Sequence, residues 1–426
     1  MAKDDNLFAR ALEYHGGSCP GKVCVCSSKP LDGAEDLSLA YTPGVAAPVL
    51  AIQKDASKSY DYTTRGNLVA VISNGTAVLG LGNCGALASK PVMEGKGQLF
   101  KRFADINVFD LEVDCPDPER FVEVVRALEP TFGGINLEDI RAPECFYIEK
   151  RLQELMSIPV FHDDQHGTAV VLGAAFLNAL HLVDKRVEEV KVVFSGAGAA
   201  ATACMHMLLA FGVKRDNLTV CDEHGVLYAG RQPLLPHQVE FARDTQLRTL
   251  AQAMEGADCF VGLSVGGVVS ADMVRSMAAN PLVLAMANPY PEIAYEDAKG
   301  ARQDVIIGTG RSDYPNQINN VLGFPAIFRG ALDVRARCIN EAMKVAASQA
   351  LAQLARQPLS EGLQMEYGLP EKPFGADYLL PKPGDPRVPR WVAFAVAQAA
   401  LGSGVAPQSF ELEEYKSALE RRFPQG

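Results

Sequence analysis

Short apolar runs alternate with amphipathic stretches through the first part of the chain. After a loop-rich start with helical pieces, residues 68–82 predict a buried strand, a turn at Asn74-Gly75 and a second strand. The elements expected next are a helix at 96–104, a strand at 106–113, a helix at 118–130, a strand at 132–140, a helix at 143–155 and a strand at 158–163. Because strands and helices alternate, this pattern predicts a parallel sheet.

The alternation continues in a second unit. A long helix is expected at 167–183, followed by a strand that ends at Ser195, a glycine turn and another helix. Four further apolar strands end in small or polar residues and are expected at 218–222, 258–264, 282–289 and 305–310. After residue 325 the chain is mostly helical. The predicted fold class is therefore α/β, with two parallel sheets and C-terminal helices that return to the first domain.

Composition narrows the class of protein. The chain has 426 residues, 48% of them hydrophobic, which is enough for two domains. Its net charge is −11 and it has no long block of Lys and Arg, so nucleic acids and anionic membranes are poor partners. The N-terminal residues do not form a signal peptide, and the apolar stretches are too short or too polar for a membrane span. We expect a soluble cytoplasmic protein.

Ten cysteines raise the question of a metal or redox site. Three of them, Cys19, Cys24 and Cys26, lie close together near His15. Their spacing matches no common zinc pattern, and a disulfide framework is unusual in a chain of this size without a signal peptide. Structural or incidental thiols are the favoured interpretation.

A glycine turn between a predicted strand and helix carries the G-x-G-x-x-A form of the dinucleotide-binding fingerprint. Its residues are Gly196, Ala197, Gly198, Ala199, Ala200 and Ala201. The glycines permit a tight turn and close approach of a pyrophosphate, and the helix start offers free N–H groups to the phosphates. A merely structural turn is the less favoured alternative.

Asp222 ends the next predicted strand, where a carboxylate can accept hydrogen bonds from the ribose hydroxyls. Glu223 and His224 follow it. Two carboxylates oppose the dianionic 2′-phosphate of NADP, so the sequence favours NAD over NADP, unless Lys or Arg from elsewhere reverses that preference.

Two acidic pairs also end apolar strands. Glu138 and Asp139 follow one strand, and Asp163 and Asp164 follow another. Ligands bind at the carboxyl ends of strands in open α/β folds, and converging carboxylates repel unless a cation such as Mg²⁺ or Mn²⁺ lies among them. Spacing alone leaves a second interpretation equally open, in which Asp164 caps the following helix.

Several long segments together resemble the malic enzymes, specifically the shorter bacterial type. The similar segments are YHGGSCPGKVCVCSSKPLDGAEDLSLAYTPGVAAP, NGTAVLGLGNCGALASKPVMEGKGQLFKRFADINVFD, INLEDIRAPECFYIEKRL, IPVFHDDQHGTA, GAGAAA, AMANPYPE, NQINNVLGFP and YLLPKPGDPRVP. The resemblance covers nearly the whole chain. Some bacterial members carry a further phosphotransacetylase-like domain, and we expect this protein to lack it.

The resemblance implies roles for individual residues. Tyr41 matches the family's proton donor and Lys96 its general base. The family's metal ligands match Glu138, Asp139 and Asp164, with Asp163 expected to support Asp164 through hydrogen bonds. Positions near substrate and nicotinamide match Thr76, Asn288 and Asn320.

Two departures from the family pattern matter. Larger members bind a substrate carboxylate with an arginine near the VLGLG segment, which has none here; Arg65 is a weak candidate to replace it. The acidic pair at 222–223 also differs from members with Ser or Lys in this region, which puts the use of NADP in doubt.

The activity implied is oxidative decarboxylation of (S)-malate to pyruvate and CO₂ with reduction of NAD(P)⁺, with decarboxylation of oxaloacetate as a further expected reaction. A metal and a partly dry cleft should lower the pKa of the Lys96 base. Two other enzymes, a malolactic-type enzyme and a two-domain amino-acid or folate dehydrogenase, are alternatives, and a non-catalytic dinucleotide sensor is a third. The expected domains are a substrate and metal domain at 1–163, an NAD(P)-binding Rossmann domain at 164–320 and a C-terminal helical segment at 321–426. The resemblance also implies a homodimer or higher oligomer.

Overall fold

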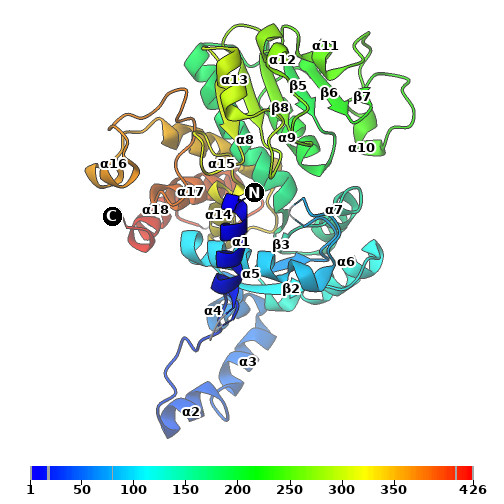
Figure 1. Ribbon diagram of the computed structural model, residues 1–426. Coiled ribbons are helices and arrows are strands. Elements are labelled where there is room, and N and C mark those ends of the chain that lie inside the picture. Colours follow the sequence, from blue (N-terminus) through cyan, green and yellow to red (C-terminus); the bar gives the residue numbers. More distant parts are fainter. Residues whose placement is uncertain (1, 17–19, 79, 408–409, 425–426) are drawn as a thin grey trace.

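Two sheets, the first parallel and the second parallel except for one short edge strand, form the framework of the molecule (Figure 1). The computed structural model describes residues 2–16, 20–78, 80–407 and 410–424. The first sheet has the strand order β2-β1-β3-β4, all parallel, and consists of β1 (Leu68–Ser73), β2 (Asn107–Glu112), β3 (Gly134–Leu137) and β4 (Val160–His162). The α/β class and the parallel pairing predicted from the alternation are confirmed.

The central strand β1 is buried on both faces, which explains its continuous apolar run. Val69 and Val71 point to one core, and Ala70 and Ile72 to the other. Helices and 3₁₀ turns accompany this sheet: α1 (Ala2–His15), α2 (Ala34–Ala40), α3 (Ala46–Lys54), η1 (Ala56–Lys58), α4 (Ser59–Tyr62), η2 (Thr64–Asn67), α5 (Ala86–Ala104), α6 (Pro118–Ala127), η3 (Glu129–Thr131) and α7 (Glu144–Leu155).

The second strand expected within 68–82 is wrong. After β1 the backbone turns and makes only an isolated bridge between Val78 and Gly82. Gly80 and Gly82 have φ angles of +77° and +81°, which lie in the left-handed region and cannot continue an extended strand. Residue 79 lies outside the described residues. The segment is therefore a loop that leads from β1 into α5.

The second sheet has the order β10-β9-β8-β5-β6-β7. Its strands are β5 (Val192–Ser195), β6 (Leu218–Asp222), β7 (Gly225–Val226), β8 (Cys259–Gly262), β9 (Leu282–Ala285) and β10 (Ile306–Thr309). The short antiparallel strand β7 was not predicted. The accompanying helices and turns are α8 (Asp163–Val183), α9 (Ala199–Ala210), η4 (Arg215–Asn217), α10 (Pro236–Val239), α11 (Leu250–Met254), α12 (Ala271–Ser276), α13 (Tyr295–Ala301) and η5 (Asn320–Leu322).

The long helix α8 joins the two units. Within the described residues, it is the one helix long and apolar enough to cross a membrane, and 67% of its most apolar window is buried inside the molecule. Such burial is typical of the core helix of a globular protein.

The C-terminal part is helical, as expected, and consists of α14 (Phe324–Asp333), α15 (Glu341–Ala355), α16 (Glu361–Tyr367), α17 (Arg387–Gly402) and α18 (Leu412–Arg422). α14 returns to the first unit, where the rings of Phe324 and Phe328 lie 4.7 and 5.3 Å from that of Phe100 on α5. α15 packs instead against α8, where the hydroxyl of Ser348 donates to the carbonyl of Val170 at 2.8 Å.

The segment from α2 to α3 projects from the body of the molecule (Figure 1). We call residues 34–54 the arm. None of the residues of α2 or α3, all of which are described, is buried. The arm carries exposed apolar side chains, namely Leu37, Leu39, Val49 and Leu50.

Candidate active site

Three carboxylates meet at the carboxyl ends of two neighbouring strands. Glu138 and Asp139 directly follow β3, and Asp164 lies in the first turn of α8 after β4, which pairs with β3. One oxygen from each of the three lies within 4.8 Å of the others. Glu138 and Asp139 are buried, and Asp164 is partly exposed. The structure thus brings together the three residues that the family resemblance matched to metal ligands.

The backbone holds this carboxylate group in place. Asp139 has a left-handed φ of 54°, and its N–H donates to Asp164 Oδ2 at 2.8 Å. Asn136 Nδ2 donates to Glu138 Oε2 at 2.9 Å. The alternative in which Asp164 caps the helix is wrong, because α8 begins at Asp163 and its N-cap is His162.

Lys96 lies beside the three carboxylates. It projects from α5, is almost fully buried, and places Nζ 2.8 Å from Glu138 Oε1 and 2.6 Å from Asp163 Oδ2. Its ammonium also lies 4.3 Å from the centre of the Phe324 ring. The cluster of Lys96, Glu138, Asp139, Asp163 and Asp164 therefore joins β3, β4 and α5 in one place.

Asp163 has a different environment from the one expected. Its Oδ2 accepts from Lys96 and from Asn320 Nδ2, so it holds the lysine and the η5 turn rather than the carboxylate of Asp164. Asn320 comes from the C-terminal end of the second unit, and its contact with Asp163 closes the site between the two sheets.

The electrostatics of the cluster are dominated by burial. Loss of hydration raises the pKa of Glu138 and of Asp163 to about 7, and that of Asp164 to about 6, while Lys96 acts in the opposite direction. Burial by itself would lower the pKa of Lys96, but the charges of Asp163 and Glu138 outweigh it and raise that pKa above its ordinary value. The lowering of the Lys96 pKa that is expected from a bound metal stays a prediction.

The donor set fits a hard divalent cation. Three carboxylate groups converge from two strand ends, and carboxylate oxygens are the ligands that Mg²⁺ and Mn²⁺ prefer. Burial and, to a lesser extent, repulsion from a neighbouring carboxylate raise the pKa of Glu138 and of Asp164, and a bound cation would offset both effects. Among the described residues, this is the only such group of three. Cys24 and Cys26 are exposed free thiols outside it, and Cys19 lies outside the described residues.

Thr76 lies at the edge of the cluster, in the loop after β1. Its hydroxyl donates to Asn74 Oδ1 at 2.7 Å and accepts from the N–H of Arg141 at 3.1 Å. Arg65 is not a neighbour of this edge, because it precedes β1 and donates to the carbonyl of Phe132 at the opposite end of the sheet. Arg141, two residues after Asp139, is an arginine near this edge, but its exposed guanidinium donates to Glu144 Oε1 at 3.0 and 2.6 Å.

Tyr41 is not brought to the cluster. It directly follows α2 on the projecting arm and is 68% exposed (Figure 1). Its backbone hydrogen bonds go to Leu37 and Val45, which belong to the same arm. The structure of one chain therefore separates Tyr41 from Lys96.

The glycine turn has the geometry of a phosphate-binding loop. Gly196 has a φ of +111°, and a Cβ there would lie 2.3 Å from the carbonyl oxygen of Leu263, so glycine is required. A Cβ on Gly198 would meet no atom within 4 Å, which leaves open space in front of α9. Gly198 is the N-cap of α9 and offers no side chain to the first N–H groups, and Ala199 and Ala200 begin the helix. These features fit a dinucleotide pyrophosphate.

Asp222 is paired with a cation that the sequence analysis missed. Its Oδ2 accepts from Arg231 Nη2, and its Oδ1 accepts from the N–H of His224 at 2.8 Å. Arg231 is buried and also donates to the carbonyls of Gly225 and Val226. Because Arg231 balances the charge of Asp222, the electrostatic reason for preferring NAD is weakened.

Asn288 follows β9 and faces the loop after β1. A Cβ on Gly80 would lie 3.4 Å from the Asn288 carbonyl oxygen, so the two sheets bring their carboxyl ends together here. Beside it, the buried carboxylate of Glu292 accepts from the N–H groups of Ser264 and Ala287 and fixes the loops after β8 and β9. Asn288 and Asn320 therefore lie on the loops between the two units, and their roles stay predictions.

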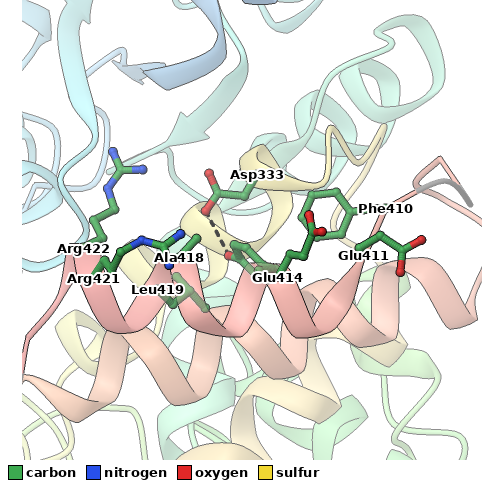
Figure 2. Close-up of a pocket in the computed structure, with 9 residues that line it drawn as sticks. Asp333, Phe410, Glu411, Glu414, Ala418, Leu419, Arg421 and Arg422 are labelled. Atoms are coloured by element: carbon green, nitrogen blue, oxygen red, sulfur yellow. Dashed lines mark hydrogen bonds between the residues drawn. The ribbon is translucent and has the colours of Figure 1, made fainter.

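A separate cavity of about 550 Å³ lies over α18 (Figure 2). It is lined by Asp333, Phe410, Glu411, Glu414, Tyr415, Ala418, Leu419, Arg421 and Arg422. Tyr415 donates to Asp333 Oδ2 at 2.9 Å across it. It shares no residue with the Lys96 cluster, so the chemistry predicted from the sequence is not located there.

Comparison with known proteins gives one family. The family described as "Malic enzyme, N-terminal domain" matches residues 20–119 and 115–153, and "Malic enzyme, NAD binding domain" matches residues 165–364. A malic enzyme structure from Pyrococcus horikoshii has a TM-score of 0.89 at 42% identity, covering 97% of this chain and 95% of that one.

Curated relatives differ in cofactor and in length. An NADP-dependent malic enzyme of Escherichia coli is 59% identical over 95% of this chain and 53% of its own length. An NAD-dependent malic enzyme of Rhizobium meliloti is 54% identical over 98% of this chain and 54% of its own length. A bifunctional malic/malolactic enzyme of Bacillus subtilis is 49% identical over 96% of this chain and 97% of its own length. The chain spans about half the length of the first of these relatives.

Proposed function

Because the chain belongs to the malic enzyme family, we propose that it catalyses the oxidative decarboxylation of (S)-malate to pyruvate and CO₂, with NAD(P)⁺ as the hydride acceptor. The observation that carries this proposal is the position of Lys96. The buried ammonium of Lys96 contacts Asp163 and Glu138. Through Glu138 it adjoins the group of three converging carboxylates. A lysine in such surroundings is suited to moving a proton.

Lys96 is the proposed general base. Its amine would take the proton of the malate C2 hydroxyl as hydride leaves C2 for the nicotinamide. The amine must first be neutral, and Asp163, whose carboxylate contacts it and is not among the proposed cation ligands, is the proposed proton acceptor. Asn320 keeps Asp163 in place for this exchange.

Glu138, Asp139 and Asp164 are the proposed ligands of Mg²⁺ or Mn²⁺. When bound, such a cation polarises the substrate oxygen, stabilises the charge that develops as CO₂ leaves, and offsets the carboxylates that raise the pKa of Lys96. Oxaloacetate, whose decarboxylation needs no hydride transfer, is the second expected substrate.

Tyr41 is the proposed acid that protonates C3 after CO₂ has left. Because the arm holds it away from Lys96 of the same chain, we propose that the arm delivers Tyr41 to the site of a second copy. The exposed apolar residues of the arm support this arrangement, since such surfaces are normally covered by a partner. The protein would then be a homodimer, or a larger oligomer of such pairs.

NADP is the proposed cofactor, with NAD as a poorer one. Arg231 neutralises Asp222, and the relative from Escherichia coli is named as NADP-dependent. The glycine turn would hold the pyrophosphate through Gly196, Ala197, Gly198, Ala199 and Ala200. Thr76, Asn288 and Asn320 are the proposed contacts to substrate and nicotinamide, and the domains are proposed as 1–163, 164–320 and 321–426.

A malolactic reaction is the alternative that has a specific relative behind it. It would release lactate and leave no net reduced cofactor. A non-catalytic dinucleotide sensor would not require a buried Lys96 in contact with Asp163 and Glu138. The small-molecule substrates expected are malate, pyruvate and oxaloacetate, and a cytoplasmic location remains our proposal.

One assay tests the proposal and separates the alternatives. Malate is supplied with NAD⁺ or NADP⁺, each with Mn²⁺ or with EDTA, while absorbance at 340 nm and the organic acids are followed. We expect pyruvate and reduced cofactor in equal amounts, a higher kcat/KM with NADP⁺, and loss of activity with EDTA. Lactate without reduced cofactor would instead establish the malolactic reaction. Full activity in EDTA would show that the reaction does not require a metal.

A further inference from the structure

A buried carboxylate lies directly beneath the turn that carries Asp163 and Asp164. Glu149 belongs to α7 and is only 6% exposed. Cys145, Ile148 and Leu152 share its buried face of the helix, so an acidic residue occupies a position where the helix pattern calls for an apolar one. A charge at such a site is costly unless several donors satisfy it.

The donors to Glu149 come mainly from one short segment. Its Oε1 accepts from the N–H of His162 at 3.0 Å and from His166 Nε2 at 2.9 Å. Its Oε2 accepts from Gln165 Nε2 at 3.2 Å and from the same His166 nitrogen at 3.0 Å. Residues on both sides of Asp163 and Asp164 are thus tied to one carboxylate.

The network extends to the C-terminal helices. Lys344 on α15 places Nζ 3.2 Å from His166 Nδ1. Gln153, one turn along α7, donates to Glu149 Oε1 at 3.2 Å and to the carbonyl of Val160 in β4 at 3.2 Å. Glu149 therefore fixes the end of β4 and the start of α8 relative to each other, and through His166 it reaches α15.

We propose that Glu149 is a positioning residue of the proposed cation site. It holds segment 162–166 so that Asp164 faces Glu138 and Asp139 while Asp163 faces Lys96. Glu149 lies outside the group of three converging carboxylates, so it acts through the backbone and side chains that it holds. The inference rests on the proposed function, because it requires that Glu138, Asp139 and Asp164 bind a divalent cation.

The direct test is the affinity for Mn²⁺ without substrate, measured by titration calorimetry or by the electron paramagnetic resonance of free Mn²⁺. Glu149→Gln keeps the size of the side chain but replaces an acceptor oxygen by a donor. Groups that orient metal ligands typically change affinity by about 10- to 100-fold, so we expect the Kd for Mn²⁺ to rise by about that factor. The kcat for malate at saturating Mn²⁺ should fall much less than the Mn²⁺ affinity.

The matched control is Glu129→Gln. Glu129 also accepts backbone and side-chain bonds just before β4, from Ser157 N at 3.0 Å and Ser157 Oγ at 2.7 Å, and these bonds do not involve segment 162–166. Its substitution should leave the Kd for Mn²⁺ unchanged. A merely structural role for Glu149 would lower the Tm without a selective change in Mn²⁺ affinity.

A second variant covers the case in which Glu149→Gln does not fold. Gln165→Leu keeps a buried side chain and removes one donor to Glu149, and we expect the Kd for Mn²⁺ to rise by about 3- to 10-fold. If folded variants at both positions bind Mn²⁺ as the natural protein does, the positioning role is overturned while the cation site stands. If the natural protein itself binds no Mn²⁺, both the cation site and the positioning role fail.

Discussion

The Lys96 cluster and the arm are two parts of one predicted acid–base pair, and they are built in opposite ways. Lys96 is buried, contacts two carboxylates and lies between elements of both units. Tyr41 is exposed on a segment whose helices have no buried residue among those described. The core thus fixes the proposed base within one chain, whereas the proposed acid lies on an exposed segment.

This difference affects how precisely each side chain is positioned. Residues on packed strands and helices are held within a fraction of an ångström by their neighbours, as Lys96 is by Asp163 and Glu138. An exposed segment gains such precision only by binding a partner. We therefore expect substitutions in the cluster to act on each chain by itself, and substitutions in the arm to act through the assembly.

The largest effect is expected for Lys96→Ala. Loss of a general base typically costs between 10² and 10⁴, so kcat for malate oxidation should fall by about 10³-fold. Lys101→Ala, on the same helix but in an exposed pair with Asp105, is the control and should stay within about twofold, because exposed pairs contribute little. If Lys96→Ala kept the natural turnover, Lys96 would not be the general base.

Tyr41→Phe should have the next largest effect. Loss of the proton donor should lower kcat by about 10²-fold while the affinity for malate and Mn²⁺ is kept. Tyr62→Phe serves as the control, since Tyr62 is similarly exposed beyond the arm. Hydride transfer should be less affected than pyruvate formation, and an unchanged rate of pyruvate formation would exclude Tyr41 as the acid.

The affinity for Mn²⁺ should depend on pH because of the buried carboxylates. Burial raises the pKa of Glu138 to about 7 and of Asp164 to about 6, so both are partly protonated at low pH and must lose protons to bind a cation. The apparent Kd should therefore fall by about 50-fold from pH 5 to pH 6, by about a further tenfold from pH 6 to pH 7, and level off above pH 7. Binding that is flat from pH 5 to pH 8 would contradict the cluster's electrostatics.

The strand alternation was enough to predict much of the fold and the convergence of carboxylates at the strand ends, whereas the choice of three of them as metal ligands came from the family resemblance. Glu138, Asp139 and Asp164 end adjacent parallel strands, and such ends share one edge of a sheet whatever the details of packing. The second strand within 68–82 failed because glycines with left-handed φ angles interrupt an otherwise apolar run. Local pattern does not reveal that conformation.

Contacts between distant segments were beyond the sequence. Arg231 lies only nine residues after Asp222, but the sequence does not reveal that the turn after β7 brings its guanidinium to that carboxylate, which weakens the electrostatic reason for preferring NAD. Asp163 was placed beside Asp164, yet Lys96 and Asn320 hold it. Glu149 did leave a signal, since it interrupts the apolar face of helix 144–155. The sequence also does not reveal that Tyr41 lies on an exposed arm, and its proposed place in the site of a second copy stays a prediction.

Hybrid dimers test the central claim most directly. Lys96→Ala and Tyr41→Phe chains with different affinity tags are co-expressed, and the dimer that carries both tags is isolated. If the arm completes the site of its partner, one of the two sites in each hybrid has both natural residues, and the hybrid should regain about half of the natural activity although each parent is nearly inactive. Hybrids as inactive as their parents would contradict the account, because Tyr41 would then not act on the site of a second copy.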